Sequence, residues 1–143
     1  MPGSVPHNNI PAHVLLVDDQ PANLLALEAS LAPLDVAFVR AETGRRAIEL
    51  AGGGHAAMVL DDRLPDMRGE EVARQVIGAL GDRCPPIVLY TAADFGRAER
   101  DAWRAAGIAE VLLKAGDPQV LRATLESFVR QARDLFTAPD GEC

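Results

Sequence analysis

Five short apolar runs divide this chain of 143 residues, and each is rich in valine, leucine or isoleucine. The runs cover residues 14–17, 36–39, 57–60, 87–90 and 111–113. Apolar runs of this length without alternating polar residues are typical of strands buried on both faces, as in parallel sheets. The segments between the runs carry apolar residues at helical spacing, so strands and helices are expected to alternate along the chain.

Local signals indicate where some of these helices begin and end. Thr43 is placed to cap a short helix, Gly81 ends another, and Asp117 followed by Pro118 is typical of the start of a third. Five strands alternating with five helices predict an α/β fold. We expect a single doubly wound five-stranded parallel sheet in the flavodoxin-like strand order 2-1-3-4-5, with right-handed crossovers.

The composition fits one compact domain. A length of 143 residues is close to the commonest domain size, and 48% hydrophobic with 24% charged residues is ordinary for a globular protein. A formal net charge of -7 would repel a phosphate backbone, so direct binding of nucleic acid is not expected. The N-terminus lacks the pattern of a secretory signal and no apolar run is long enough to span a membrane, which favours a cytoplasmic protein.

The ends of the chain are rich in proline, glycine and polar residues. We therefore expect a flexible leader over residues 1–12, the folded domain over 13–137 and a flexible tail over 138–143. Cys84 and Cys143 lack the spacing of a metal site and are expected to be free thiols. The three histidines lack such spacing as well, and none stands at a position typical of catalysis.

Polar residues capable of chemistry stand where four of the predicted strands end. Asp18 and Asp19 follow the first strand, Asp61 the third, Thr91 the fourth and Lys114 the fifth. The carboxyl ends of parallel strands meet at one edge of a sheet, so these side chains are expected to converge. Carboxylate oxygens are the ligands that hard divalent cations prefer, and a hydroxyl and an ammonium group can bind phosphoryl oxygens.

Each of these residues also has an ordinary structural interpretation. The Asp18–Asp19 pair could be a solvated acidic turn, Thr91 a plain strand residue and Lys114 a surface lysine. Asp61 ends the central strand and is the best candidate for a nucleophile, because a carboxylate can attack phosphorus. The neighbouring Asp62 leaves that choice undecided on position alone.

Several motifs agree in order and spacing with one known family. The string VLLVDDQ resembles the first strand and acidic pair of the receiver (CheY-like) domain of two-component response regulators. The string DDRLPDMRG, residues 61–69, resembles the family signature D-x-x-[ML]-P-x-M-x-G, and this register selects Asp61 as the phosphoacceptor. Thr91, Ala92 and Lys114 match the family's hydroxyl, its following small residue and its lysine. The resemblance covers essentially the whole predicted fold.

The resemblance implies a magnesium site. Asp19, Asp61 and the backbone carbonyl of Arg63 would bind Mg²⁺ directly, while Asp18 would assist through water. As Mg²⁺ relieves the repulsion between neighbouring carboxylates, this set agrees with the chemistry of the residues themselves.

The resemblance also implies the reaction and the partners. Thr91, Ala92 and Lys114 would hold the oxygens of a phosphoryl group transferred to Asp61 from a phosphohistidine. The donor would be a sensor histidine kinase or a histidine phosphotransfer protein, and the domain would help to hydrolyse its own aspartyl phosphate. Such a domain is a signalling switch for a downstream effector protein, not a metabolic enzyme, and the amphipathic last helix is a candidate surface for a homodimer.

Two positions depart from the family pattern. Ala115 follows the lysine where the family usually has a proline, often after a cis peptide bond, and Val111 stands where a tyrosine or phenylalanine usually rotates. These departures support an alternative, a pseudo-receiver that binds proteins without phosphorylation. An aspartate-nucleophile phosphatase ranks last, because such enzymes commonly need a second aspartate two residues after the nucleophile, where this chain has Arg63.

Overall fold

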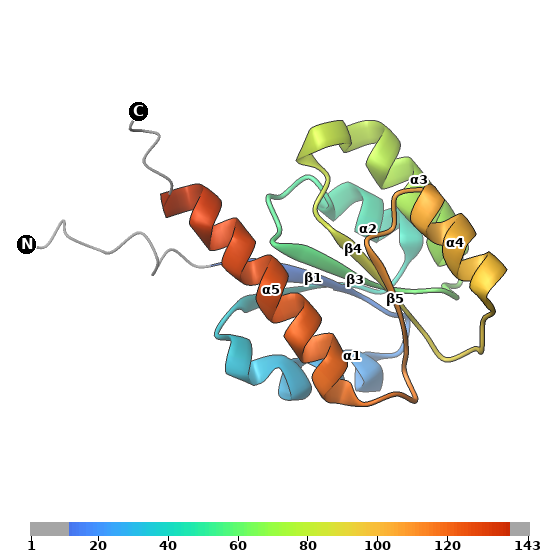
Figure 1. Ribbon diagram of the computed structural model, residues 1–143, viewed down its shortest axis with the longest axis horizontal. Coiled ribbons are helices and arrows are strands. Elements are labelled where there is room, and N and C mark those ends of the chain that lie inside the picture. The colour runs from blue at the N-terminus through green and yellow to red at the C-terminus, as the bar shows by residue number, and fades with distance from the viewer. Residues whose placement is uncertain (1–11, 138–143) are drawn as a thin grey trace, which may run out of the picture.

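The computed structural model describes residues 12–137, so the expected leader, apart from Ala12, and the expected tail lie outside the described residues. The elements in chain order are β1 (His13–Val17), α1 (Pro21–Leu31), η2 (Ala32–Leu34), β2 (Ala37–Ala41), α2 (Gly44–Leu50), β3 (Ala57–Asp61), α3 (Gly69–Leu80), η3 (Gly81–Arg83), β4 (Ile87–Thr91), α4 (Arg97–Ala105), β5 (Glu110–Leu113) and α5 (Pro118–Thr137). Figure 1 shows how these helices wrap a central sheet.

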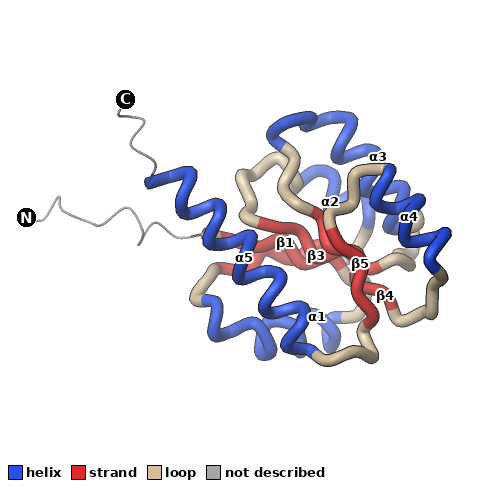
Figure 2. Tube along the Cα trace, viewed as in Figure 1, coloured by secondary structure: helices blue, strands red, loops and turns tan. Residues whose placement is uncertain are grey.

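All five strands are parallel and lie in the order β2-β1-β3-β4-β5, which confirms the predicted fold class and topology. The helices form two layers, with α1 and α5 on one face of the sheet and α2, α3 and α4 on the other (Figure 2). Both faces are therefore covered, as the continuous apolar runs predicted.

Successive residues of each strand feed the two layers alternately. On β1, Leu15 and Val17 belong to the core beneath α2, α3 and α4, whereas Val14 and Leu16 belong to the core beneath α1 and α5. This alternation follows from the period of two residues along a strand. In both cores the residues from β1 are at most 1% exposed.

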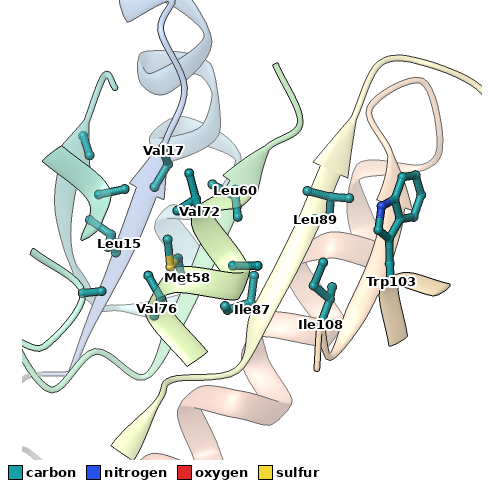
Figure 3. Packing of buried hydrophobic residues seen from close by; sticks show 14 of the residues in the cluster. Leu15, Val17, Met58, Leu60, Val72, Val76, Ile87, Leu89, Trp103 and Ile108 are labelled. Atoms are coloured by element: carbon teal, nitrogen blue, oxygen red, sulfur yellow. The ribbon is translucent and has the colours of Figure 1, made fainter. Parts of the chain in front are cut away.

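The helices α3 and α4 contribute unequally to the core beneath α2, α3 and α4. Figure 3 shows part of this core. From α3, the side chains of Val72 and Val76 point into it. Of the nine residues of α4, all of them described, Trp103 alone is buried. A helix held by one large side chain is less firmly attached than its neighbours, because few apolar contacts oppose its displacement.

The helix signals in the sequence correspond to real hydrogen bonds. The side chain of Thr43 accepts from the backbone N–H of Arg46 at 3.0 Å at the start of α2. Asp117 accepts from the backbone N–H of Gln119 at 2.9 Å, with Pro118 as the first residue of α5. The second strand covers 37–41, slightly later than predicted, because it pairs in register with the whole of β1.

No helix within residues 12–137 is both long enough and apolar enough to cross a lipid bilayer.

Candidate functional site

The strand ends meet in one cleft at the carboxyl edge of the sheet. Its volume is about 510 Å³, and the residues that line it are Asp19, Gln20, Asn23, Asp61, Arg63, Thr91, Ala92, Ala93 and Lys114. Asp18 lies directly beneath, where its carboxylate contacts Lys114. The structure therefore brings together all the residues that the sequence selected, from four different strand ends.

Three carboxylates form the acidic part of the cleft. Ligand oxygens of Asp18, Asp19 and Asp61 all lie within 4.8 Å of one another, and within residues 12–137 no other group of three acidic, histidine or cysteine side chains is as close. The donors are all oxygen and the carboxylates outnumber the one ammonium group beside them. This set fits a hard divalent cation such as Mg²⁺.

Lys114 joins two of these carboxylates. Its Nζ donates to Oδ2 of Asp18 at 2.9 Å and lies 3.3 Å from Oδ1 of Asp61. Its backbone N–H donates to the carbonyl of Thr91 at 2.8 Å, which fixes the end of β5 against the end of β4. Burial alone would lower the pKa of Lys114, but the hydrogen bond to Asp18 and the charges of both aspartates raise it above its ordinary value.

Asp61 lies in a partly desolvated position, with a side chain only 13% exposed. Burial raises the pKa of its carboxyl above the ordinary value; the charge of Lys114 opposes this shift and the charge of Asp18 adds to it. Ionising Asp61 is therefore less favourable than ionising a carboxyl group in water, and additional positive charge in the cleft would favour the ionised form.

Asp62 faces away from the cleft, as expected for the residue next to a strand end. It is 4% exposed and accepts from Nη2 of Arg68 at 2.7 Å. This ion pair gives Asp62 a structural role in the loop after β3. Position in the sequence left the choice between Asp61 and Asp62 undecided. Of the two, only Asp61 lines the cleft.

The loop between β3 and α3 is tightly closed. The backbone N–H of Gly69 donates to the carbonyl of Asp62 at 2.7 Å, and Asp66 accepts from the N–H groups of Gly44 and Arg45 at 2.8 and 2.9 Å. These two bonds lower the pKa of Asp66 and tie the loop to the start of α2. These hydrogen bonds restrain the loop and, with it, the backbone at Arg63, which lines the cleft.

Gly69 explains the end of the sequence signature. A Cβ atom there would lie 2.5 Å from the carbonyl oxygen of Asp61 and 3.0 Å from a methyl carbon of Leu89. Any side chain would press on the backbone of Asp61 itself. The glycine is required by this close approach and not by an unusual backbone angle.

Thr91 is 2% exposed, and its hydroxyl oxygen accepts from the backbone N–H of Ala93 at 3.1 Å. That bond leaves the hydroxyl proton available for another acceptor. The small side chains of Ala92 and Ala93 leave the cleft open above it.

Asp18 has more donors than the sequence indicated. It is 1% exposed and accepts from the backbone N–H of Gln20 at 2.9 Å, from Lys114, and from Nδ2 of Asn23, which lies 3.3 Å from each carboxylate oxygen. Sequence reasoning missed Asn23. Its place in the first turn of α1, directly after the acidic strand end, is the signal that could have identified it.

A family model described as the response regulator receiver domain matches residues 14–126 of the chain. The chain belongs to this family. As a receiver domain it is part of the two-component signalling systems, and receiver domains act as signalling switches.

Relatives of this receiver domain include several longer regulators. It is 33% identical over 120 residues to the response regulator PleD of Caulobacter vibrioides, covering 83% of this chain and 26% of PleD. It is 34% identical to the response regulator MprA of Mycolicibacterium vanbaalenii, covering 92% of this chain and 54% of MprA. The aerobic respiration control sensor protein ArcB of Escherichia coli is 31% identical, with 81% of this chain and 15% of ArcB covered. The chain thus spans about half the length of these relatives, or less.

Solved structures agree with the fold. The signal receiver domain of a LuxO repressor from Vibrio parahaemolyticus has a TM-score of 0.79 at 23% identity and covers 90% of this chain and 99% of its own. The receiver domain of the sensor histidine kinase PA1611 from Pseudomonas aeruginosa has a TM-score of 0.72 at 26% identity, covering 84% and 98%. Its structure has a magnesium ion coordinated in the active site cleft.

The two departures from the receiver pattern are well accommodated. Val111 is completely buried in the core beneath α2, α3 and α4 and pairs with Leu89 in the sheet. The bond between Lys114 and Ala115 is trans, as are all peptide bonds among residues 12–137. An aromatic pair lies elsewhere: Phe95, in the loop after β4, packs edge to face on Trp103 with ring centres 5.5 Å apart.

Proposed function

We propose that this receiver domain accepts a phosphoryl group on Asp61 in a reaction that requires Mg²⁺. The observation that carries the proposal is the cleft itself, in which the Asp61 carboxylate lies 3.3 Å from the ammonium group of Lys114 and within 4.8 Å of two further carboxylates. A partly buried nucleophile beside a cation and a set of oxygen ligands for a metal is the arrangement that phosphoryl transfer needs.

In the proposed reaction an oxygen of Asp61 attacks the phosphorus of a phosphohistidine. The new bond joins that oxygen to phosphorus, the phosphorus–nitrogen bond breaks, and its electron pair returns to the imidazole of the donor. The product is an aspartyl phosphate, and water later attacks the phosphorus to release inorganic phosphate and restore Asp61. The domain promotes these steps by position and charge, and it acts as a switch and not as a metabolic enzyme.

The oxygen ligands of the cleft fit a bound magnesium ion. Asp19, Asp61 and the backbone carbonyl of Arg63 would hold Mg²⁺, with Asp18 acting through water. When bound, the ion supplies positive charge opposite the phosphoryl oxygens. The raised pKa of Asp61 in the free protein supports this role, since added positive charge stabilises the ionised form of a carboxyl group that burial disfavours.

Three residues would bind the phosphoryl oxygens and offset the remaining negative charge. Lys114 would turn from its contacts with Asp61 and Asp18 to a phosphoryl oxygen, and the Thr91 hydroxyl and the Ala92 backbone would donate to the others. The free proton of the Thr91 hydroxyl and the open space above Ala92 support these assignments.

The proposed partners follow from the chemistry. The donor is a sensor histidine kinase or a histidine phosphotransfer protein in the cytoplasm, and the phosphorylated domain signals to an effector protein. The relatives named above, which include response regulators and a sensor protein, support such partners. A homodimer through α5 is a further proposal, supported by Val120 and Leu135, which are 48% and 80% exposed on that helix. Sedimentation as a monomer before and after phosphorylation would remove it.

A pseudo-receiver is the second candidate, because Val111 and Ala115 replace family residues used in switching. The site has the complete set of residues expected for phosphorylation, which argues against a pseudo-receiver. This set is Asp18, Asp19, Asp61, Thr91 and Lys114. The two candidates differ in one experiment, the transfer of a labelled phosphoryl group from a phosphorylated histidine phosphotransfer protein. The proposal predicts that label moves to this chain only when Mg²⁺ is present. If no label moves from several competent donors, the pseudo-receiver is favoured.

A further inference from the structure

Asn23 lines the cleft, but neither the sequence motifs nor the family assignment gives its side chain a function. It lies in the first turn of α1 and is exposed at the rim of the cleft. Its Nδ2 reaches inward to the buried Asp18 and lies 3.3 Å from both Oδ1 and Oδ2. The same side chain lines a second cavity of about 310 Å³ between α1 and α5, which Asp18 and Lys114 also line. Asn23 and Lys114 thus line both cavities.

Asp18 depends on its donors because it is only 1% exposed. A nearly buried carboxylate that loses a donor has little access to water that could replace it, so the loss is more serious than at the surface. Three groups donate to Asp18: Lys114, the backbone N–H of Gln20 and the amide of Asn23. Lys114 holds Oδ2, at 2.9 Å, and the Gln20 N–H holds Oδ1.

One of these donors has to change partner in the proposed reaction. When Lys114 turns to a phosphoryl oxygen, Oδ2 of Asp18 loses its strongest contact. The Gln20 N–H holds the other oxygen, so the amide of Asn23 is then the described side chain that still reaches Oδ2. Because an amide is neutral, it also leaves the negative charge of the cleft available to a cation, which a lysine or arginine at the same place would reduce.

We propose that Asn23 is a positioning residue for the phosphoryl-transfer site: it fixes the Asp18 carboxylate for the magnesium site while Lys114 is engaged elsewhere. This inference rests on the function proposed above. Asn23 acts through Asp18 and makes no contact with the reacting oxygen of Asp61.

The test compares the full chain with Asn23→Leu, which removes the amide at similar size, and Asn23→Gln, which keeps an amide. Ser30→Ala is the matched control, because Ser30 lies on the same helix and lines the second cavity without contacting Asp18. Mg²⁺ affinity is measured by calorimetric titration with MgCl₂. Phosphorylation is measured by intact mass with acetyl phosphate over a range of donor concentrations.

For Asn23→Leu we expect Mg²⁺ to bind roughly threefold to tenfold more weakly, and the maximal rate at saturating Mg²⁺ to fall about tenfold, as for a lost hydrogen bond to a charged group. The half-saturating concentration of acetyl phosphate should not change, since Asn23 is not expected to bind the donor. Asn23→Gln should recover most of both losses, and Ser30→Ala should behave like the unaltered chain.

Two results separate the inference from the function beneath it. If the unaltered chain is phosphorylated and Asn23→Leu matches it in Mg²⁺ affinity and maximal rate, the inference is wrong and the proposed function stands. If the unaltered chain takes no phosphoryl group, the proposed function fails, and the Mg²⁺ titrations alone decide whether Asn23 positions Asp18. A lower melting temperature of Asn23→Leu with unchanged affinity and rate would show a merely structural role and would also overturn the inference.

Discussion

The ammonium nitrogen of Lys114 lies 3.3 Å from Oδ1 of Asp61 and 2.9 Å from Oδ2 of Asp18, so one cation serves two carboxylates of the cleft. In the free protein it offsets part of their mutual repulsion. In the phosphorylated protein, by our proposal, the same group binds a phosphoryl oxygen. Lys114 therefore affects both the binding of Mg²⁺ and the transfer of the phosphoryl group, and a substitution can test the two effects separately.

Replacing Lys114 with methionine keeps the length of the side chain and removes its charge. We expect the rate of phosphorylation by acetyl phosphate to fall roughly 100-fold, as when one donor is removed from a site of developing negative charge. Mg²⁺ should bind at least as tightly as before, because a neighbouring cation that repels it has gone. Calorimetric titration and intact mass measure the two effects. An undiminished rate in Lys114→Met would contradict the role given to Lys114.

Gly69→Ala tests the close approach between the end of the signature loop and Asp61. The added methyl group would lie 2.5 Å from the Asp61 carbonyl oxygen, so backbone has to move. We expect unfolding free energy to fall by about 1–3 kcal/mol, as in overpacked cores, together with slower phosphorylation. The matched control is Gly78→Ala on the same helix, where a Cβ meets nothing within 4 Å. That change should stabilise the helix by about 0.5–1 kcal/mol in urea unfolding. Equal effects of the two substitutions would refute the explanation.

We expect the stability of the fold to depend on pH through His55, which lies far from the cleft. Its Nε2 lies 2.8 Å from the carbonyl of Leu50, and its Nδ1 lies 2.8 Å from Nδ1 of His13, at the opposite ends of β1 and β3 from Asp61. Burial lowers the pKa of His55; the Leu50 carbonyl opposes this and His13 adds to it. The unfolded chain therefore binds a proton more readily than the folded one.

The sign of the effect follows from that difference. Stability is fully present above the unfolded pKa of about 6.5 and is lost as the pH falls through the lower folded pKa. Each unit of lowering corresponds to about 1.4 kcal/mol. Urea unfolding between pH 8 and pH 5 should show a decline that is smaller in His55→Leu, after subtraction of the constant loss from that substitution. Parallel curves for the two proteins would mean that His55 does not cause the decline.

The fluorescence of Trp103 can report whether phosphorylation in the cleft changes the structure at α4. It is the only tryptophan in the sequence, it anchors α4, and its ring packs on Phe95 in the loop that follows Thr91. With Val111 in place of an aromatic residue, we expect movement of this loop to reach α4 through the Phe95–Trp103 contact. Tryptophan emission should change on phosphorylation, and the change should be much smaller in Phe95→Leu at equal phosphorylation. Constant emission in a fully phosphorylated protein would exclude this route.

The strand ends could be predicted from the sequence because their signals are local. Each apolar run is continuous, and a general rule for parallel sheets brings the residues that follow such runs to one edge. The positions of Asp18, Asp61, Thr91 and Lys114 at the carboxyl edge of the sheet can therefore be predicted from the sequence. The family signature added the choice of Asp61 over Asp62; in the structure Asp61 lines the cleft, whereas Asp62 forms an ion pair with Arg68.

Contacts between distant segments could not be predicted in this way. The hydrogen bonds from Gly44 and Arg45 to Asp66 join residues more than 20 positions apart, and nothing local in either segment signals them. The second strand was misplaced slightly because its extent depends on its pairing with β1.

The most direct test of the account is the intact mass of three proteins after incubation with acetyl phosphate and Mg²⁺: the unaltered chain, Asp61→Asn and Asp62→Asn. We predict a gain of one phosphoryl group in the unaltered chain and in Asp62→Asn, which loses only its ion pair with Arg68. Asp61→Asn, and every sample without Mg²⁺, should gain nothing. A phosphoryl group on Asp61→Asn, or its absence from the unaltered chain, would contradict the central claim that Asp61 is the phosphoacceptor.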